Sequence, residues 1–115
     1  MPDTNAIATV ASTLRVVPGF SSDEVDDLVG VLSPSLDRRL SRYTVEQVEM
    51  ELSVKDRDTD KQRVVLEAWI AQGSRERFVA TSTERELRAA VLEVRDSLRR
   101  QVNRHVTRRE TSRRR

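Results

Sequence analysis

Apolar side chains recur every three or four residues between Thr83 and Val106, which is the pattern of an amphipathic helix. The apolar positions are Leu87, Ala90, Val91, Val94, Leu98, Val102 and Val106. Thr83 precedes Glu86 by three residues, the spacing of a capping box at a helix start. We therefore predict one helix over Thr83–Val106, with one apolar stripe that faces a core.

A second helical pattern runs over Val25–Tyr43 and keeps its phase across Ser33-Pro34. Its apolar positions are Val25, Leu28, Val29, Leu32, Leu36, Leu40 and Tyr43. Ser21-Ser22 and the acidic residues after it suit a helix start, where hydroxyl caps and carboxylates stabilise the free N–H groups. Because proline removes a hydrogen bond and clashes with the preceding turn, we predict a helix that is kinked or broken at Ser33-Pro34.

Between these helices the hydrophobic period changes to two, which predicts half-buried strands. The alternation covers Val48–Val54, Val64–Ile70 and Arg77–Ser82, separated by short polar connectors. Such connectors make the three strands antiparallel neighbours. One more strand is predicted at Ser12–Val17, where Pro18-Gly19 ends it.

The order is strand, helix, three strands, helix (β-α-β-β-β-α), and each helix and the sheet have one apolar side. The economical packing is an α+β two-layer sandwich, a four-stranded sheet with both helices on one face, in the manner of a double-stranded RNA-binding domain. We predict a flexible N-terminus over residues 1–10, one domain over residues 11–106, and a basic disordered tail over residues 107–115.

Charge is divided unevenly along the chain, although the net charge is only +2. Residues 1–74 hold 8 basic and 13 acidic residues, whereas residues 75–115 hold 13 and 6. This asymmetry indicates a polyanionic partner on one side of the molecule. Two arginine clusters stand out, one at the end of the first long helix and one along the last helix. If the two helices lie side by side, the clusters form one patch; the alternative is that they only solvate the backs of the helices.

The residues that catalysis or metal binding would need are sparse. The chain has no cysteine and one histidine, His105, for which packing or RNA contact is favoured over catalysis. Gly19, Gly30 and Gly73 are isolated, so no phosphate-binding glycine loop is present. The three aspartates of the connector at residues 56–61 lack the glycine and the final glutamate of a calcium loop. We expect no enzyme activity, metal, cofactor or small-molecule substrate.

Trp69 lies on the other face of its strand, where it either stacks against a partner or shields the sheet together with Val65 and Val79.

No apolar run is long enough for a membrane span, and the first residues lack the features of a signal peptide. We expect a cytoplasmic protein with no membrane partner.

Five segments carry a resemblance to one family: Arg39-Leu40-Ser41-Arg42-Tyr43, Val48–Val54, Phe78–Ser82, Leu87–Val91 and Asp96–His105. They resemble the ribosome hibernation-promoting factor family, which includes ribosome-associated inhibitor A and the sigma-54 modulation proteins. The first segment is similar to the R-L-x-R-F/Y end of the family's first helix, and the second to its second strand. The other three are similar to its last strand and closing helix, which ends in D-x-L-x-R-Q-L-x-K-H. The family's tyrosine near the start of that helix is Arg88 here.

The resemblance implies a bacterial, cytoplasmic inhibitor of translation. Members of the family bind the small ribosomal subunit of the intact ribosome, in the channel for mRNA and the A- and P-site tRNAs. They keep ribosomes idle under stress or in dormancy, by steric occlusion. The partners implied are ribosomal RNA and neighbouring ribosomal proteins. The chain looks like a short form, which is not expected to pair ribosomes through a C-terminal domain of its own.

The resemblance assigns the RNA contacts to basic residues of both helices and of the tail. They are Arg38, Arg39, Arg42, Arg88, Arg95, Arg99, Arg100, Arg104, His105, Arg108 and Arg109. Two alternative functions stay open. One is a stand-alone RNA-binding module that recognises duplex shape; the other is a stress-response regulator that has lost ribosome binding and contacts proteins through the face of Trp69.

Overall fold

The computed structural model describes the backbone of residues 6–113 and the side chains of residues 6–106. The strands are β1 (Leu14–Val16), β2 (Val48–Lys55), β3 (Arg63–Gln72) and β4 (Ser74–Ser82). The helices are α1 (Val10–Thr13), α2 (Ser22–Leu40), the short 3-10 helix η1 (Val45–Gln47) and α3 (Leu87–Arg113). The predicted strand–helix–three strands–helix order is therefore present, with α1 and η1 added to it.

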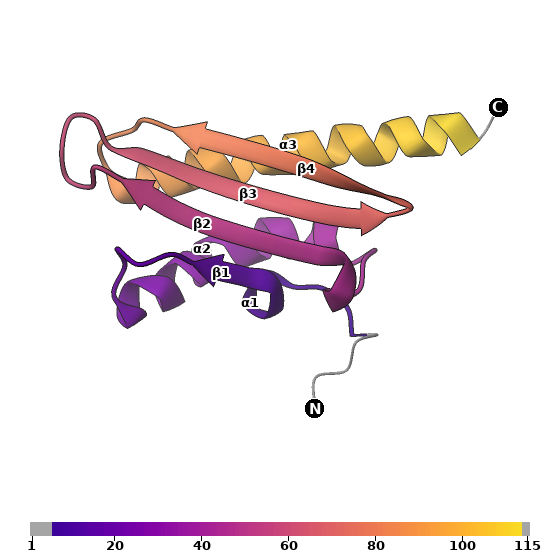
Figure 1. The fold of residues 1–115 in the computed structure, drawn as a ribbon, viewed down its shortest axis with the longest axis horizontal. Coiled ribbons are helices and arrows are strands. Elements are labelled where there is room, and N and C mark those ends of the chain that lie inside the picture. The colour runs from indigo at the N-terminus through magenta and orange to yellow at the C-terminus, as the bar shows by residue number, and fades with distance from the viewer. Residues whose placement is uncertain (1–5, 114–115) are drawn as a thin grey trace.

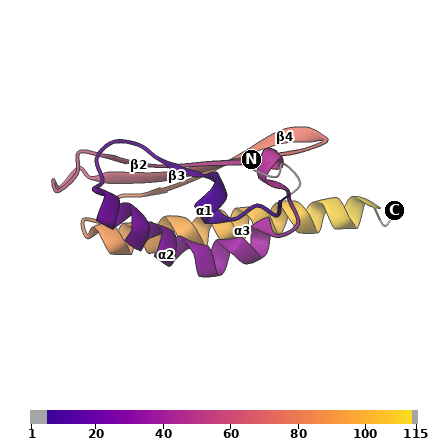
Figure 2. The same ribbon diagram turned by 90° about the horizontal axis from the view of Figure 1, so that it is seen from below.

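The four strands form one sheet in the order β1-β2-β3-β4 (Figure 1). β1 is parallel to β2, and the other two neighbouring pairs are antiparallel. Seen along the sheet, α2 and α3 lie side by side on the same face (Figure 2). The predicted α+β two-layer sandwich with both long helices on one face is confirmed.

The core lies between the sheet and these two helices. Alternate residues of β2, β3 and β4 face inward, as the period of two predicts. The helices contribute one stripe each, and the buried members are Leu28, Leu32, Leu36 and Leu40 from α2 and Ala90, Val91, Val94, Leu98 and Val102 from α3. The period of 3.6 thus identified the buried side of each helix correctly.

The N-terminal segment departs from the prediction of a flexible end. Ala8 and Val10 are fully buried, and the N–H of Ala8 donates to the carbonyl of Tyr43 at 2.9 Å. The N–H of Val10 donates to the Asp37 carboxylate at 2.8 Å. Residues 6–10 are therefore part of the fold, and residues 1–5 lie outside the described part. Two small buried apolar residues give no period from which the sequence could predict this.

The predicted first strand is also shorter than expected. Ser12 and Thr13 belong to α1, where the Ser12 hydroxyl and the Thr9 side chain cap the helix reciprocally. β1 begins at Leu14 and ends at Val16. Hydroxyl residues stabilise helix starts as readily as strands, and here the local cap decided the outcome.

α2 is continuous from Ser22 to Leu40 with Pro34 inside it, so the predicted break is absent, and the alternative of a kink at Ser33-Pro34 stays a prediction. Its start is the capping box that the sequence indicates, because Ser21 Oγ accepts from the Glu24 N–H at 3.2 Å and Glu24 Oε1 accepts from the Ser21 N–H at 2.9 Å. Four leucines on one stripe anchor the helix to the sheet on both sides of the proline. This shared packing outweighs the hydrogen bond that Pro34 cannot make.

α3 begins later and ends later than predicted. Its first turn is capped by Glu86, whose carboxylate accepts from the N–H groups of Arg88 at 3.2 Å and Ala89 at 2.7 Å. The helix then continues to Arg113, so the predicted disordered tail is helical over residues 107–113, and residues 114–115 lie outside the described part. No glycine or proline follows Thr83 to end it, and arginine is a good helix former. Within the described residues no helix is apolar enough over a sufficient length to cross a membrane.

Candidate nucleic-acid interface

α2 and α3 run in the same direction, and this alignment decides where their charges meet. Arg95 Nη1 donates to the carbonyl of Val31 at 3.4 Å, and Arg99 Nη1 donates to Ser35 Oγ at 3.2 Å. A step of four residues along α3 therefore corresponds to a step of four along α2. α2 is acidic near its start and carries Arg38 and Arg39 in its last turn. Parallel packing places these two arginines next to Arg95 and Arg99 of α3, and Figure 2 shows the two helices side by side.

Four of the predicted arginines surround one hollow between the two helices. We call it the basic hollow; it has a volume of about 280 Å³ and is lined by Pro34, Ser35, Arg38, Arg39, Arg95 and Arg99. Arg38 and Arg39 are exposed, and Arg95 and Arg99 are partly covered. The predicted merger of the two arginine clusters into one patch is present here.

Among the residues whose side chains the structure describes, one carboxylate is paired with the arginines of the basic hollow, that of Asp96. Asp96 Oδ1 accepts from Arg95 Nε at 2.9 Å and lies 3.8 Å from Arg99 Nη2. The other nearby acid, Asp37, accepts from the Val10 N–H instead. The hollow therefore keeps a surplus of positive charge, and the hydrogen bonds to Val31, Ser35 and Asp96 hold Arg95 and Arg99 in place.

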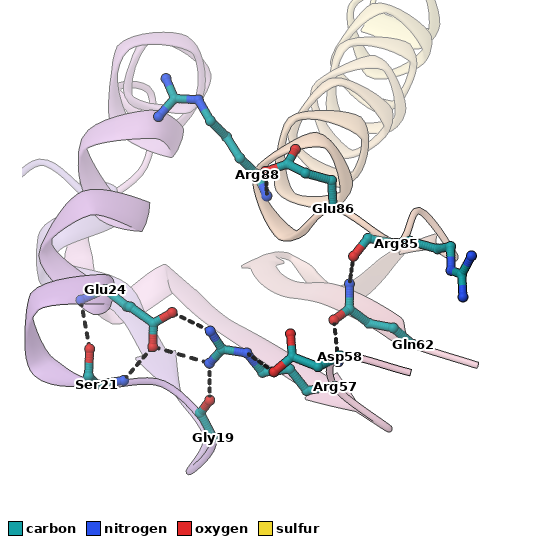
Figure 3. Close-up of polar contacts among 9 residues, drawn as sticks. All are labelled: Gly19, Ser21, Glu24, Arg57, Asp58, Gln62, Arg85, Glu86 and Arg88. Atoms are coloured by element: carbon teal, nitrogen blue, oxygen red, sulfur yellow. Dashed lines mark hydrogen bonds and ion pairs between the residues drawn. The ribbon is translucent and has the colours of Figure 1, made fainter. Parts of the chain in front are cut away.

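Arg88 lies at the other end of the helix pair. It lines a smaller hollow of about 150 Å³ together with Glu24, Asp27 and Leu28 of α2. Its side chain points towards α2 (Figure 3). The structure therefore separates Arg88 from the basic hollow and places it among acids, although the sequence grouped it with Arg95 and Arg99.

Three further arginines lie away from the basic hollow. Arg100 is exposed on the back of α3, and Arg42 is exposed in the turn that follows α2. Arg104 lines a third hollow, beside β4. Arg108 and Arg109 are predicted contacts whose side chains lie outside the described residues.

His105 is nearly buried, with 9% of its surface exposed. Its ring meets that of Phe78 edge-to-face, with centroids 5.4 Å apart. Of the two roles that the sequence left open for this residue, the structure favours packing.

The acidic end of the helix pair is fixed by Arg57, which the sequence did not single out. Its guanidinium pairs with the Glu24 carboxylate and donates to the Gly19 carbonyl at 2.5 Å (Figure 3). It also lies over the Phe20 ring, 5.5 Å from the ring centroid. The hydrogen bonds from Arg57, and then from the Ser21 N–H, lower the pKa of Glu24 to about 2. The contact joins the β2–β3 loop to the start of α2.

Gln62 is the second residue that sequence reasoning missed, and it is 1% exposed. Its Nε2 donates to the carbonyls of Glu84 and Arg85 at 3.0 and 3.1 Å, and its Oε1 accepts from the Asp58 N–H at 3.0 Å (Figure 3). It thereby joins the β2–β3 loop to the connection that precedes α3. In the sequence it appears as one more polar residue of a turn.

The sheet face opposite the helices carries arginine–glutamate pairs. Arg15 pairs with Glu51 at 2.5 Å, Arg77 with Glu67 at 2.9 Å, and Arg75 Nη2 with Glu49 at 3.0 Å. The Arg75 guanidinium also lies over the Trp69 ring at 5.9 Å. Trp69 is half-buried among these pairs, which favours the shielding role over a stacking platform.

The structure is an α+β sandwich in which four arginines line one hollow between two packed helices. Arginine forks fixed on two rigid helices match the oxygens of phosphate groups. Among the described residues no cluster of three or more metal-binding side chains occurs. Comparison with protein-family models and with curated proteins gives no match to this chain.

Proposed function

We propose that this protein binds the RNA of the small ribosomal subunit in the mRNA and tRNA channel and holds the ribosome inactive by obstruction. The observation that carries the proposal is the basic hollow. Arg38 and Arg39 of one helix and Arg95 and Arg99 of its parallel neighbour line a common space. Within residues 6–106, Asp96 is the one carboxylate that forms an ion pair with them.

The resemblance to hibernation-promoting factors supports the choice of partner. The segments that carry the resemblance, Arg39–Tyr43 and Asp96–His105, lie at the two sides of the basic hollow and provide part of its lining. The hydrogen bonds to Val31, Ser35 and Asp96 hold Arg95 and Arg99 in place, so these two guanidinium groups can bind phosphates at a smaller ordering cost. Obstruction requires no catalysis, and the proposed partner places the protein in the cytoplasm.

The basic hollow suits a folded RNA better than a regular duplex. A duplex-binding module spans successive grooves and contacts the phosphates along them. Here the positive charge is concentrated at one end of the helix pair, while Arg88 at the other end lies with Glu24 and Asp27. An extended duplex laid along α2 and α3 would meet acids over the first half of its path.

A competition experiment tests the proposed location. Labelled protein is mixed with vacant small subunits and with subunits that carry mRNA and tRNAs in the A and P sites, and the bound fraction is measured by sedimentation. We expect binding to vacant subunits and little binding to filled ones. Equal binding to both would contradict occlusion of the channel.

A second arm separates ribosome binding from general RNA binding. Naked duplex RNA is added as a competitor, at the same phosphate concentration as the vacant subunits. We expect it to displace the protein far less well than unlabelled subunits do. Equal displacement would instead identify a stand-alone RNA-binding module.

A further inference from the structure

β4 is an open edge of the sheet whose outward backbone groups can be assigned. The Leu52 carbonyl accepts from the Val17 N–H, so Leu52 faces β1 and its partner Leu66 on β3 faces β4. Ala80, opposite Leu66, then bonds to β3, and the residues next to it face outward because the pattern alternates. The outward N–H and carbonyl groups belong to Arg75, Arg77, Val79 and Thr81.

One of these outward groups is already bonded by a side chain. Gln101 of α3 donates from Nε2 to the Val79 carbonyl at 2.8 Å. Val79 itself is 37% exposed, one of two exposed large apolar residues in the described part. A primary amide at this point imitates the N–H of a neighbouring strand. Figure 1 shows β4 at the border of the sheet, with α3 alongside it.

A hollow of about 660 Å³ adjoins this edge on the helix side, and we call it the edge hollow. Phe78 and His105, in edge-to-face contact, contribute its apolar lining. Gln101, Asn103 and Arg104 contribute its polar lining. Side chains of an added strand alternate between the two faces of the sheet, so every second one would enter the edge hollow.

The charge beside β4 indicates which kind of ligand could bind along this edge. Two arginines, Arg77 and Arg104, and one acid, Glu76, line the edge hollow, so an acidic segment is favoured. A second copy joined edge to edge by a two-fold axis would bring the arginines of both α3 helices together. Nucleic acid would place phosphates against the outward carbonyls of β4. Only a peptide backbone matches alternating donors and acceptors.

We propose that β4 accepts an acidic, extended peptide of a partner protein as a fifth strand, displacing the Gln101 amide and placing an apolar side chain over Phe78 and His105. This surface is separate from the basic hollow, so the proposal does not depend on ribosome binding. Backbone hydrogen bonds would supply affinity, and the edge hollow and Arg104 would supply specificity.

The probe is a labelled synthetic peptide that alternates leucine with threonine and carries two glutamates at each end. Binding is measured by fluorescence anisotropy, and the contact surface is mapped by backbone amide NMR. We expect saturable binding below about 1 mM, with the largest shifts at the amides of Arg75, Arg77, Val79 and Thr81. Failure to bind, or shifts confined to the basic hollow, would overturn the proposal.

Two variants give opposite expectations. Val79→Pro removes an outward N–H without touching the bonds to β3, and it should weaken probe binding about tenfold. Gln101→Ala removes the amide that the probe must displace, and it should strengthen binding about threefold. Unchanged affinity in both would refute strand addition; if the proline variant unfolds, Gln101→Ala and the NMR map decide the matter.

Further probes test whether a basic peptide, an RNA or a second copy of the protein binds to β4 instead. A peptide with lysine in place of each glutamate should bind at least about tenfold more weakly, and a peptide with proline at alternate positions should not bind. A single-stranded RNA that displaces the acidic peptide and shifts the same β4 amides would contradict the proposal. So would self-association of the free protein through these amides.

Discussion

Gln62 shows how one buried amide can hold two connections of a small sandwich. Its side-chain amide makes three hydrogen bonds to backbone atoms of two separate segments, to Asp58 on one side and to Glu84 and Arg85 on the other. Without the side chain these backbone groups would lose a part-buried hydrogen bond each. An unpaired buried polar group is costly, so this position should tolerate few residues.

We expect Gln62→Ala to lower the free energy of unfolding by about 2 kcal/mol, because it leaves backbone groups unpaired and creates a cavity. The exposed neighbour Lys61 provides a control, because Lys61→Ala should change the free energy of unfolding by less than about 0.5 kcal/mol. Urea denaturation followed by circular dichroism measures both. Equal effects would show that the bonds of Gln62 contribute nothing of their own.

The Glu24–Arg57 contact makes stability depend on pH. The pKa of Glu24 in the folded protein is about 2, below the ordinary value of 4.5. A depressed pKa stabilises the folded state fully above about 4.5, and the contribution is lost as the pH falls towards 2.

The Glu24→Gln variant should therefore lose less stability than the wild type between about pH 5 and pH 2.5. Arg57→Ala should show the same flattened dependence, and the double variant should add little to either single change. Denaturation curves at several pH values measure this. A wild-type acid dependence retained in Glu24→Gln would contradict the assignment.

Sequence reasoning found Glu24 but not its partner. The serine–glutamate spacing predicts the cap of α2 directly, since both residues belong to one helical turn. Arg57 belongs to a loop in which Asp56 and Asp58 adopt left-handed backbone conformations. No local pattern indicates that such a loop folds back onto the start of a helix.

At the scale of elements, Gly30 and Pro34 are the unusual pair within α2. Proline at position 34 removes the bond to the carbonyl of residue 30 and crowds that carbonyl. Gly30 is exposed, and a Cβ at that position would meet nothing within 4 Å. Both residues weaken the helix, and the leucine stripe compensates.

We expect Gly30→Ala to raise the free energy of unfolding by about 0.5 to 1 kcal/mol, through the lower conformational entropy of the unfolded chain. Gly19 is the contrasting position. Its φ is +129°, and a Cβ added there would lie 3.3 Å from Val54 Cγ1. Gly19→Ala should destabilise the protein. Thermal denaturation of the two variants checks the opposite signs, and stabilisation by both would contradict this account of α2.

Most of the elements followed from hydrophobic periodicity, and the errors lie at their ends. Alternation located the three antiparallel strands, and the stripe of α3 was correct from Leu87 to Val102. The start of α3 was misplaced because Glu86 caps the helix alone. Its end was misplaced because a polar sequence without a glycine or a proline offers no stop signal.

At the scale of the whole molecule, the parallel alignment of α2 and α3 places the arginines at the end of α2 next to arginines in the middle of α3. The side-by-side placement could be predicted from the order of elements. The neighbours of each single arginine could not be predicted, because they depend on the register between the helices. That register places Arg88 beside Glu24 and Asp27 but Arg99 beside Ser35.

If the four arginines of the basic hollow each neutralise one phosphate, RNA binding should weaken as the salt concentration rises. The affinity for vacant small subunits should fall about 50-fold to 150-fold between about 50 and 200 mM monovalent salt. Filter binding at several salt concentrations gives the slope directly. Affinity that stays constant over this range would exclude phosphate contacts as the source of binding.

The most direct test compares two charge reversals of equal size in sucrose-gradient sedimentation with vacant small subunits. One variant combines Arg38→Glu with Arg39→Glu in the basic hollow, and the other combines Lys55→Glu with Arg63→Glu, an exposed cross-strand pair on β2 and β3. We expect the first variant to remain at the top of the gradient while the second sediments with the subunits like the wild type. Equal loss in both variants, or binding retained in the first, would contradict a specific role for the basic hollow.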